Sequence, residues 1–137
     1  MDQTLNSPFV SELSVLWSDM DSNGHVNNGV YQFYFDEARM QALEEEGFSL
    51  AKMREEKVGP VMYKAELSYN KPLSHPDKIR IETTFGDVTK TRGKVFQTMR
   101  RVSDGELVCQ AVFHTIFFNF NTNRPWKLPD WFIEKYS

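Results

Sequence analysis

The amino-acid sequence predicts an α+β domain in which one long amphipathic helix lies on a curved antiparallel sheet. Three observations support this prediction. Apolar residues recur at helical spacing over positions 28–46, runs of alternating apolar and polar residues fill most of the chain after position 60, and short turn-rich breaks separate those runs. Short connections indicate antiparallel neighbours, because parallel strands need long crossovers. We expect a single domain over residues 1–137, with the helix wrapped by a five-stranded antiparallel sheet.

The helix is indicated by a change of period at about Asn28. The apolar residues of its buried stripe recur three or four positions apart: Tyr31, Phe35, Ala38 and Ala42. Asn27 or Asn28 can cap the start of the helix, and Gly47 stands where it should stop. A helix over 28–46 would be about 28 Å long. Three consecutive glutamates at 44–46 oppose the helix macrodipole, so we expect the last turn to fray.

Strands are predicted where apolar and polar residues alternate with a period of two. The expected ranges are 13–17, 61–70, 78–85, about 94–102 and 108–120. The last range is apolar on both sides near its end, which indicates burial on two faces. Turn-rich segments separate the last four strands into a meander: KPLSHPD (71–77), TKTRG (89–93) and SDGE (103–106). The C-terminal segment LPDWFIEKY, residues 128–136, is expected to form a short helix.

Composition places the chain among folded proteins and excludes several classes. Of its 137 residues, 40% are hydrophobic and 14% aromatic, which is enough for a real core. The net charge of −3 gives no sign of a basic face, so nucleic acid is not an expected partner. No apolar run is long enough to span a membrane, and MDQTLNSPFV lacks the pattern of a secretory signal. The single Cys109 excludes an internal disulfide, so we expect a cytoplasmic protein.

The segment DMDSNGHVNNGVY, residues 19–31, concentrates polar side chains directly before the predicted helix. A loop that only caps the helix would explain the asparagines and Gly24. It would leave Asp19, Asp21 and His25 unexplained. The aromatic start of the helix suggests burial, where free N–H groups and the positive end of the helix dipole can stabilise an oxyanion. A carboxylate beside such groups can attack a carbonyl or deprotonate water.

The order of elements and this motif resemble the hotdog fold, and in particular the acyl-CoA thioesterases of the 4-hydroxybenzoyl-CoA thioesterase type. The similarity covers roughly residues 9–120: a strand, D-x-D-x-x-G-H-V-N-N, an aromatic helix and a four-stranded meander. Its most specific part runs from Asp21 to Asn28, with Tyr31 following. The resemblance implies hydrolysis of an acyl or aryl thioester of coenzyme A, with no cofactor beyond the coenzyme A of the substrate.

The resemblance also implies roles for residues of the motif. Asp21 matches the catalytic carboxylate of the family. Asn28 stands where the family uses a backbone N–H to polarise the thioester carbonyl. The form D-x-N-x-H-V-N-N is similar to plant acyl-carrier-protein thioesterases as well. By that match Asn23 orients water or the carboxylate and His25 carries a proton, although the benzoyl-type enzymes lack this histidine.

Three basic residues gather at a predicted hairpin loop: Lys90, Arg92 and Lys94. Taken without the resemblance, a cluster of like charges at a hairpin is typical of a loop exposed to solvent. The thioesterase family places basic residues here to meet the nucleotide phosphates of coenzyme A. The resemblance therefore makes these three residues, with Tyr31, the expected substrate-binding set, and Arg92 and Lys94 are the better matches. Asp19 is expected to brace the motif loop.

The remaining histidines and the cysteine carry weaker signals. His25, His75 and His114 lack the spacing of metal ligands, so we expect no metal site. His114 on an apolar strand is typical of a satisfied core or interface histidine. Cys109 in a strand is typical of a small apolar filler. None of these residues adds a second candidate site.

The sequence is compatible with more than one class of function. A non-catalytic hotdog module that binds acyl-CoA would need the basic residues and an apolar tunnel but no Asp21, so Asp21 with Asn23 and His25 favours a hydrolase. A hotdog dehydratase spaces its aspartate and histidine differently. Coenzyme A and acyl carrier protein are both open as the carrier of the acyl group. The aromatic side chains of Phe33 and Tyr34 are candidates to line the base of an acyl pocket, and they suit an aryl group as well as an alkyl chain.

The assembly is also predicted from the fold. A single sheet around one helix leaves edge strands exposed, and pairing of edges across a two-fold axis is the usual remedy. We therefore expect a homo-oligomer, a dimer or a tetramer. The resemblance implies that substrate lies in a groove between protomers, so that each site borrows residues from the partner.

Overall fold

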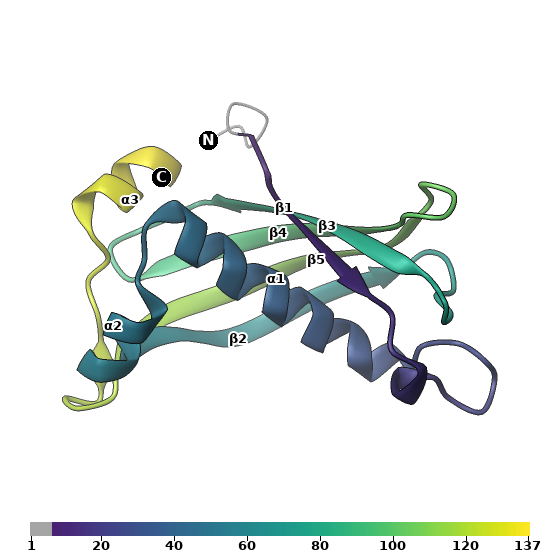
Figure 1. Ribbon diagram of the computed structural model, residues 1–137. Coiled ribbons are helices and arrows are strands. Elements are labelled where there is room, and N and C mark those ends of the chain that lie inside the picture. Colours follow the sequence, from purple (N-terminus) through teal and green to yellow (C-terminus); the bar gives the residue numbers. More distant parts are fainter. Residues whose placement is uncertain (1–6) are drawn as a thin grey trace.

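A curved antiparallel sheet wraps around one long helix in the computed structural model, which describes residues 7–137 (Figure 1). The strands are β1 (Phe9–Ser14), β2 (Val58–Tyr69), β3 (Lys78–Gly86), β4 (Arg92–Arg101), β5 (Leu107–Asn119) and the two-residue β6 (Arg124–Pro125). The helices are α1 (Tyr31–Glu46), α2 (Leu50–Glu56) and α3 (Asp130–Tyr136), and 3-10 turns span Trp17–Asp19 and Asn28–Val30. The predicted α+β class, with one long helix and five long antiparallel strands, is confirmed. Residues 1–6, part of the stretch in which no secretory signal is expected, lie outside the described residues.

The long helix begins where the sequence predicts. Asn27 is the cap, because its Oδ1 accepts a hydrogen bond from the N–H of Gly29 at 2.9 Å. The 3-10 turn that starts at Asn28 then leads directly into α1 at Tyr31. The polar loop and the helix are therefore one continuous structure.

The end of α1 differs from the expectation of a frayed turn. Gly47 ends the helix with φ 127°, a value that favours glycine, and its N–H bonds to carbonyls of the last turn. Glu46 accepts hydrogen bonds from the Tyr136 hydroxyl at 2.5 Å and from Lys135 Nζ at 2.9 Å. The C-terminal α3, which the sequence predicts, thus holds the end of α1 in place despite the three glutamates.

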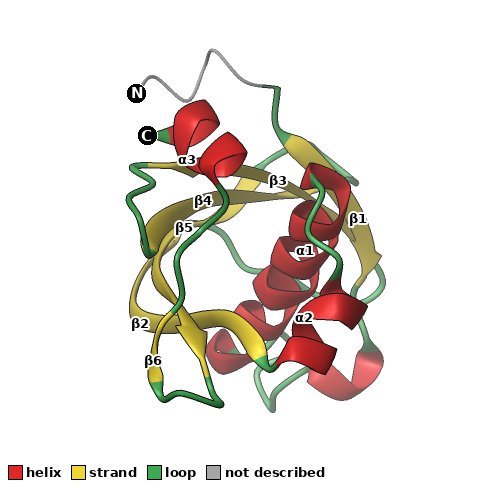
Figure 2. Cartoon of the chain, turned by 90° about the vertical axis from the view of Figure 1, so that its left-hand side faces the viewer, coloured by secondary structure: helices red, strands yellow, loops and turns green. Residues whose placement is uncertain are grey.

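The order of strands in the sheet is β1-β3-β4-β5-β2, and β6 pairs with β5. The predicted four-stranded meander is wrong for β2, which pairs with β5 instead of β3. The segment 70–77 between β2 and β3 must therefore cross three strand spacings, roughly 14 Å at the usual separation. Figure 2 shows the sheet curled around α1. The crossing segment closes the end of the curled sheet at which α1 begins.

Two further local predictions need correction. The first strand covers Phe9–Ser14 instead of 13–17, because its pairing with β3 ends at Lys78. Trp17 has left the sheet by then, in a 3-10 turn, and is 73% exposed. Helix α2 was not predicted, although Ser49 caps it by accepting a hydrogen bond from the N–H of Lys52. No helix within residues 7–137 is long and apolar enough to cross a membrane.

A polar network crosses the core between α1 and the sheet. Arg39 is only 7% exposed, its Nη1 donates to Gln97 Oε1 at 3.3 Å, and its guanidinium lies 4.1 Å from the centre of the Phe113 ring. Gln97 Nε2 in turn donates to Thr83 Oγ1 and to the Phe35 carbonyl, both at 3.0 Å. Burial lowers the pKa of Arg39, while the Asp36 carboxylate at 2.8 Å raises it. The network fixes how α1 lies on β3 and β4.

Candidate active site

A pocket of ≈ 500 Å³ opens where α1 begins. One wall holds five of the site residues predicted from the sequence: Asp21, Asn23, His25, Asn28 and Tyr31. The opposite wall consists of the end of β2 and the start of the crossing segment: Tyr69, Asn70, Lys71 and Pro72. This second wall could not be predicted from the sequence, because nothing in a strand end followed by a turn shows which distant loop it meets.

Asp21 forms the core of the motif loop. Its Oδ1 accepts hydrogen bonds from the N–H of Asn23 at 2.8 Å and of His25 at 3.4 Å. Its own N–H donates to the His25 carbonyl at 2.7 Å, and Gly24 closes the turn with φ 75°, a conformation that favours glycine. Within the described chain, Oδ2 makes no hydrogen bond. One carboxylate oxygen therefore holds the loop, and the other is available in the pocket.

Asn28 presents a free donor at the start of the helix. The N–H groups of Gly29 and Val30 both bond to Asn27, at 2.9 Å to its side chain and 2.9 Å to its carbonyl. The N–H of Asn28 has no acceptor among residues 7–137. The Tyr69 hydroxyl donates to the Asn28 carbonyl at 3.1 Å and so ties this turn to β2. The geometry leaves one N–H and the positive end of the α1 dipole at the pocket.

Two tyrosines, one buried and one exposed, line the pocket. Tyr31 is fully buried and its ring meets that of Tyr69 edge-on, with centroids 5.2 Å apart. Burial raises the pKa of Tyr31 to about 12, so its hydroxyl keeps its proton at neutral pH. Burial also raises the pKa of Tyr69. Both side chains can orient a substrate, but neither is suited to act as a base near neutral pH.

The other residues singled out near this motif lie away from the pocket. Tyr34 donates to Asp19 Oδ2 at 2.7 Å, and the Asp19 carbonyl accepts from the N–H of Asn27 at 3.1 Å, so Asp19 braces the loop as expected. Burial is also the main cause that raises the pKa of Tyr34 to about 12. Phe33 is 74% exposed. Phe33 and Tyr34 are not among the residues that line this pocket.

The three basic residues lie at the opposite end of the sheet. Arg92 is the first residue of β4, and Met99, seven positions along the strand, is level with Cys109 and Tyr69. Seven strand positions correspond to roughly 23 Å. Within one chain the basic residues therefore do not reach the pocket that holds Asp21.

Each basic residue has contacts of its own. The guanidinium of Arg92 lies 5.0 Å from the centre of the Tyr63 ring, at the β2 edge of the sheet. Lys94 Nζ is 3.0 Å from Asp87 Oδ2. The Lys90 carbonyl accepts a hydrogen bond from the N–H of Leu128 at 2.7 Å. Arg92 and Lys90 are exposed and Lys94 is half-buried, so all three can meet a charged ligand.

His114 and Cys109 behave differently from one another. Cys109 is fully buried, as expected of an apolar filler, and burial raises its pKa to about 12. His114 Nε2 is buried 3.6 Å from Glu66 Oε2 and has no hydrogen-bond partner in the part of the chain that the structure describes. The expected satisfied histidine is therefore not found within one chain. No group of three or more His, Cys, Asp or Glu side chains within residues 7–137 could hold a metal ion.

Comparison with known proteins places this chain in a family. The family model of the thioesterase-like superfamily matches residues 15–136, which include the motif loop, the helix and the sheet. The chain belongs to this superfamily. The membership expected from the D-x-D-x-x-G-H-V-N-N motif is thereby confirmed.

Solved structures and one curated protein are similar to this superfamily member. The DHNA-CoA thioesterase from Staphylococcus aureus superposes with a TM-score of 0.84 at 22% identity, over 91% of this chain and 86% of that chain. A Staphylococcus aureus protein, SAV2348, solved in complex with CoA, superposes with a TM-score of 0.82 at 20% identity, over 90% and 77%. The "Putative esterase" of Aquifex aeolicus (strain VF5) is 30% identical over 83 residues, 61% of this chain and 65% of that protein. The alignment thus spans less than two thirds of that relative, and the structural matches confirm the hotdog fold.

Proposed function

We propose that this protein hydrolyses an acyl or aryl thioester of coenzyme A to the free acid and the thiol. The observation that carries the proposal is the pairing of a free Asp21 carboxylate oxygen with a free Asn28 N–H in one pocket. Membership in the thioesterase-like superfamily supports the same reaction. A thioester is an activated acyl donor, so one carboxylate and a polarising N–H are sufficient equipment.

The proposed reaction forms a C–O bond and breaks the C–S bond of the thioester. The Asn28 N–H and the α1 dipole bind the carbonyl oxygen as it gains negative charge. Asp21 Oδ2 either attacks the carbonyl carbon, forming an acyl–aspartate anhydride that water then hydrolyses to the free acid, or takes a proton from the water that attacks the thioester carbonyl directly. The leaving sulfur departs as the thiol after it gains a proton. Asn23 and His25, both exposed at the pocket, are proposed to orient the water and to carry that proton.

Coenzyme A is the carrier that we propose, with acyl carrier protein as the alternative. SAV2348, which shares this fold, was solved in complex with CoA. The exposed basic residues Lys90, Arg92 and Lys94 suit the phosphates of a nucleotide. They lie roughly 23 Å along the sheet from this chain's own pocket. A partner protomer would therefore have to supply them.

The β2 edge offers the surface for such a partner. β2 ends the strand order, and the exposed apolar side chains along it are Val61, Met62, Tyr63 and Tyr69. The outer edge of this twelve-residue strand pairs with no other strand of the described chain, and a free edge is a template for pairing with a second copy. Antiparallel pairing of two β2 edges centred near Ala65 would place the Arg92 end of one sheet beside the Tyr69 end of the other. Each pocket would then face the basic residues of the partner.

We expect sedimentation velocity at micromolar protein to show a dimer or a tetramer. The reason is the exposed β2 edge, whose free N–H and C=O groups and exposed apolar side chains favour pairing with a second copy. Activity should fall on dilution below the dissociation constant of the assembly, because a lone protomer lacks the basic residues near its pocket. A fully active monomer would contradict the shared site.

Replacing both Arg92 and Lys94 by Ala should raise the KM for coenzyme A thioesters about tenfold or more and leave kcat nearly unchanged. Phosphate contacts remote from the carbonyl bind the ground state and the transition state alike. The KM of the wild-type protein should also rise with salt, because ions screen these exposed charges. The matched control replaces Lys78 and Arg80, two exposed basic residues of β3, by Ala. An equal KM in both double variants would assign Arg92 and Lys94 to the plain surface.

The experiment that tests the proposed function is thiol release from a panel of acyl and aryl thioesters, followed with a thiol-reactive dye. Release from coenzyme A esters, lost in the Asp21→Asn protein, is the expected result. Tight binding of acyl-CoA without any release would instead indicate a non-catalytic acyl-CoA-binding module. Release from acyl carrier protein alone would indicate the alternative carrier. Location in the cytoplasm and the lack of a further cofactor stay predictions from the sequence.

A further inference from the structure

The position of the Asp21 loop depends on the segment that crosses from β2 to β3. The N–H of Val26 donates to the Leu73 carbonyl at 2.7 Å, and the Ser74 hydroxyl donates to the Gly24 carbonyl at 2.8 Å. Leu73 is fully buried, so the segment is anchored in the core at this point. The loop that carries the proposed catalytic carboxylate therefore rests against residues 73–74, and any shift of these residues moves the loop.

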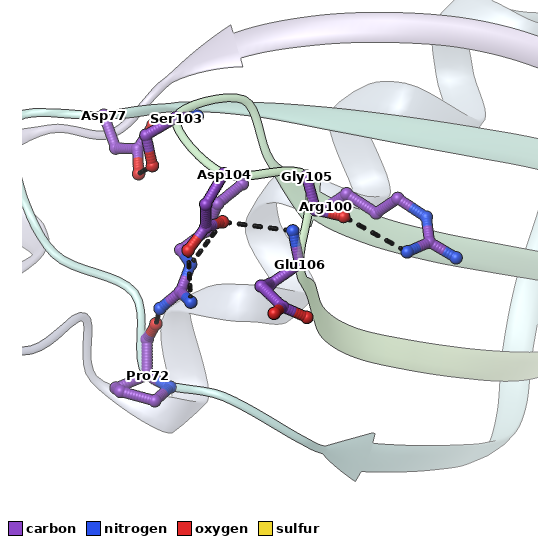
Figure 3. A network of polar contacts seen from close by, with 8 residues as sticks. Pro72, Asp77, Arg100, Ser103, Asp104, Gly105 and Glu106 are labelled. Carbon is purple, nitrogen blue, oxygen red and sulfur yellow. Dashed lines mark hydrogen bonds and ion pairs between the residues drawn. The ribbon is translucent and has the colours of Figure 1, made fainter.

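The crossing segment is itself bound at Pro72 by an arginine that forms an ion pair with Asp104 (Figure 3). Arg101, the last residue of β4, donates from Nη1 to the Pro72 carbonyl at 2.8 Å. Its Nε and Nη2 donate to Asp104 Oδ1 at 3.1 Å and Oδ2 at 2.7 Å. The N–H of Glu106 fixes Asp104 Oδ1 in turn, at 3.0 Å. Hydrogen bonding raises the pKa of Arg101 and lowers that of Asp104, so both groups are charged at neutral pH.

The other end of the crossing segment is tied to the same turn. Asp77 accepts hydrogen bonds from the Ser103 hydroxyl at 2.7 Å and from the Ser103 N–H at 3.3 Å. Hydrogen bonds from Arg101 and from the turn between β4 and β5 thus hold the segment at two points, Pro72 and Asp77. Of these two points, only Pro72 lines the pocket. It directly precedes Leu73, whose carbonyl accepts the hydrogen bond from Val26 that holds the Asp21 loop.

We propose that Arg101, oriented by Asp104, is a positioning residue for the active site. Two of its three nitrogens, Nε and Nη2, bind the Asp104 carboxylate in a fork, and the third, Nη1, donates to one backbone carbonyl. Arg101 is not among the residues that line the pocket, so its proposed effect on the reaction is indirect. It acts through Pro72 and Leu73 on the Asp21 loop, and so sets the distance between the Asp21 carboxylate and the Asn28 N–H. The effect of Arg101 on turnover rests on the proposed thioesterase function.

Arg101→Ala should lower kcat about tenfold or more per folded protein, because small displacements of catalytic groups reduce rates steeply. KM should change less than kcat, since the proposed phosphate contacts are remote. Arg101→Lys should fall between the wild type and Arg101→Ala, because an ammonium group can reach Pro72 or Asp104 but cannot form the fork. The matched control is Arg100→Ala. Arg100 is exposed and donates to the Gly105 carbonyl of the same turn at 3.3 Å, and within residues 7–137 no hydrogen bond or ion pair joins it to the crossing segment.

A second measurement separates this proposal from the proposed function. Amide hydrogen exchange over residues 21–28 should accelerate in Arg101→Ala and stay as in the wild type in Arg100→Ala, whether or not any thioester is cleaved. If Arg101→Ala does not fold, Asp104→Asn serves in its place, because it removes the charge that orients the guanidinium. Unchanged exchange over 21–28 and unchanged kcat in a folded variant would overturn the positioning role. A wild-type protein that releases no thiol, with exchange altered as expected, would overturn only the proposed function.

Discussion

Replacing Asp21 by Asn is expected to reduce thioesterase turnover by about 10²–10⁴, the usual contribution of a positioned base or nucleophile. The amide has nearly the shape of the carboxylate, and its oxygen can still accept hydrogen bonds from Asn23 and His25. The loop should therefore keep its form. The group that replaces Oδ2 is an amide nitrogen, which can neither attack a carbonyl nor take a proton from water. Substrate affinity should hold or tighten slightly, because a neutral amide repels the thioester oxygen less.

Turnover and thermal midpoint must be measured on the same preparations, because the alternative role of Asp21 is structural. If Asp21 only caps the loop, Asp21→Asn should cost about 1 kcal/mol of stability or less and leave activity intact in the folded fraction. Asp19→Asn is the matched comparison, since Asp19 braces the same loop through Tyr34. It should lower stability more than rate. A folded Asp21→Asn protein with wild-type turnover would end the catalytic assignment.

The same comparison assigns a role to His25. If the histidine carries the proton to the leaving thiol, His25→Ala should reduce turnover about as much as Asp21→Asn. If it only tunes the pocket, the loss should be smaller. The side chain is exposed at the pocket and makes no side-chain hydrogen bond within residues 7–137, so its removal should cost little stability.

The parts of the site that could be predicted from the sequence are those encoded by neighbouring residues. A loop that bonds to itself through Asp21, Asn23 and His25 leaves its signature in a single motif. The same holds for α1, whose cap, stripe and terminal glycine are all local. The opposite wall of the pocket is not encoded in this way, because Tyr69 meets Asn28 across forty-one positions of the chain.

What the sequence could not predict depends on which strands pair. Short connections correctly indicated antiparallel neighbours for β3, β4 and β5, but the same argument placed β2 beside β3. An eight-residue link between Tyr69 and Lys78 is long enough either for a hairpin or for a crossing of the sheet, and local pattern cannot distinguish the two. The separation of Arg92 from Asp21 within one chain also became visible only in the fold, whereas a site shared between protomers is already implied by the family resemblance.

Replacing Gln97 by Met is expected to lower the free energy of unfolding by about 2–4 kcal/mol, because it leaves a buried guanidinium without one of its acceptors. Methionine has nearly the volume of glutamine, so no cavity forms and the loss reports the hydrogen bonds of Gln97 to Arg39, Thr83 and the Phe35 carbonyl. Gln110→Met is the matched control. It makes the same chemical change at an exposed position of β5 and should shift stability by about 0.5 kcal/mol or less.

The double variant Arg39→Met/Gln97→Met separates the cost of an orphaned charge from the value of the network. A buried polar pair replaced on both sides by apolar residues of similar volume is often close to neutral, whereas removal of one partner is not. We therefore expect the double variant to be less destabilised than the sum of the two single variants by about 1 kcal/mol or more. Urea unfolding of all four proteins at one protomer concentration measures this coupling, because assembly would otherwise alter the apparent stability. Strictly additive losses would show that Arg39 and Gln97 contribute to stability independently of each other.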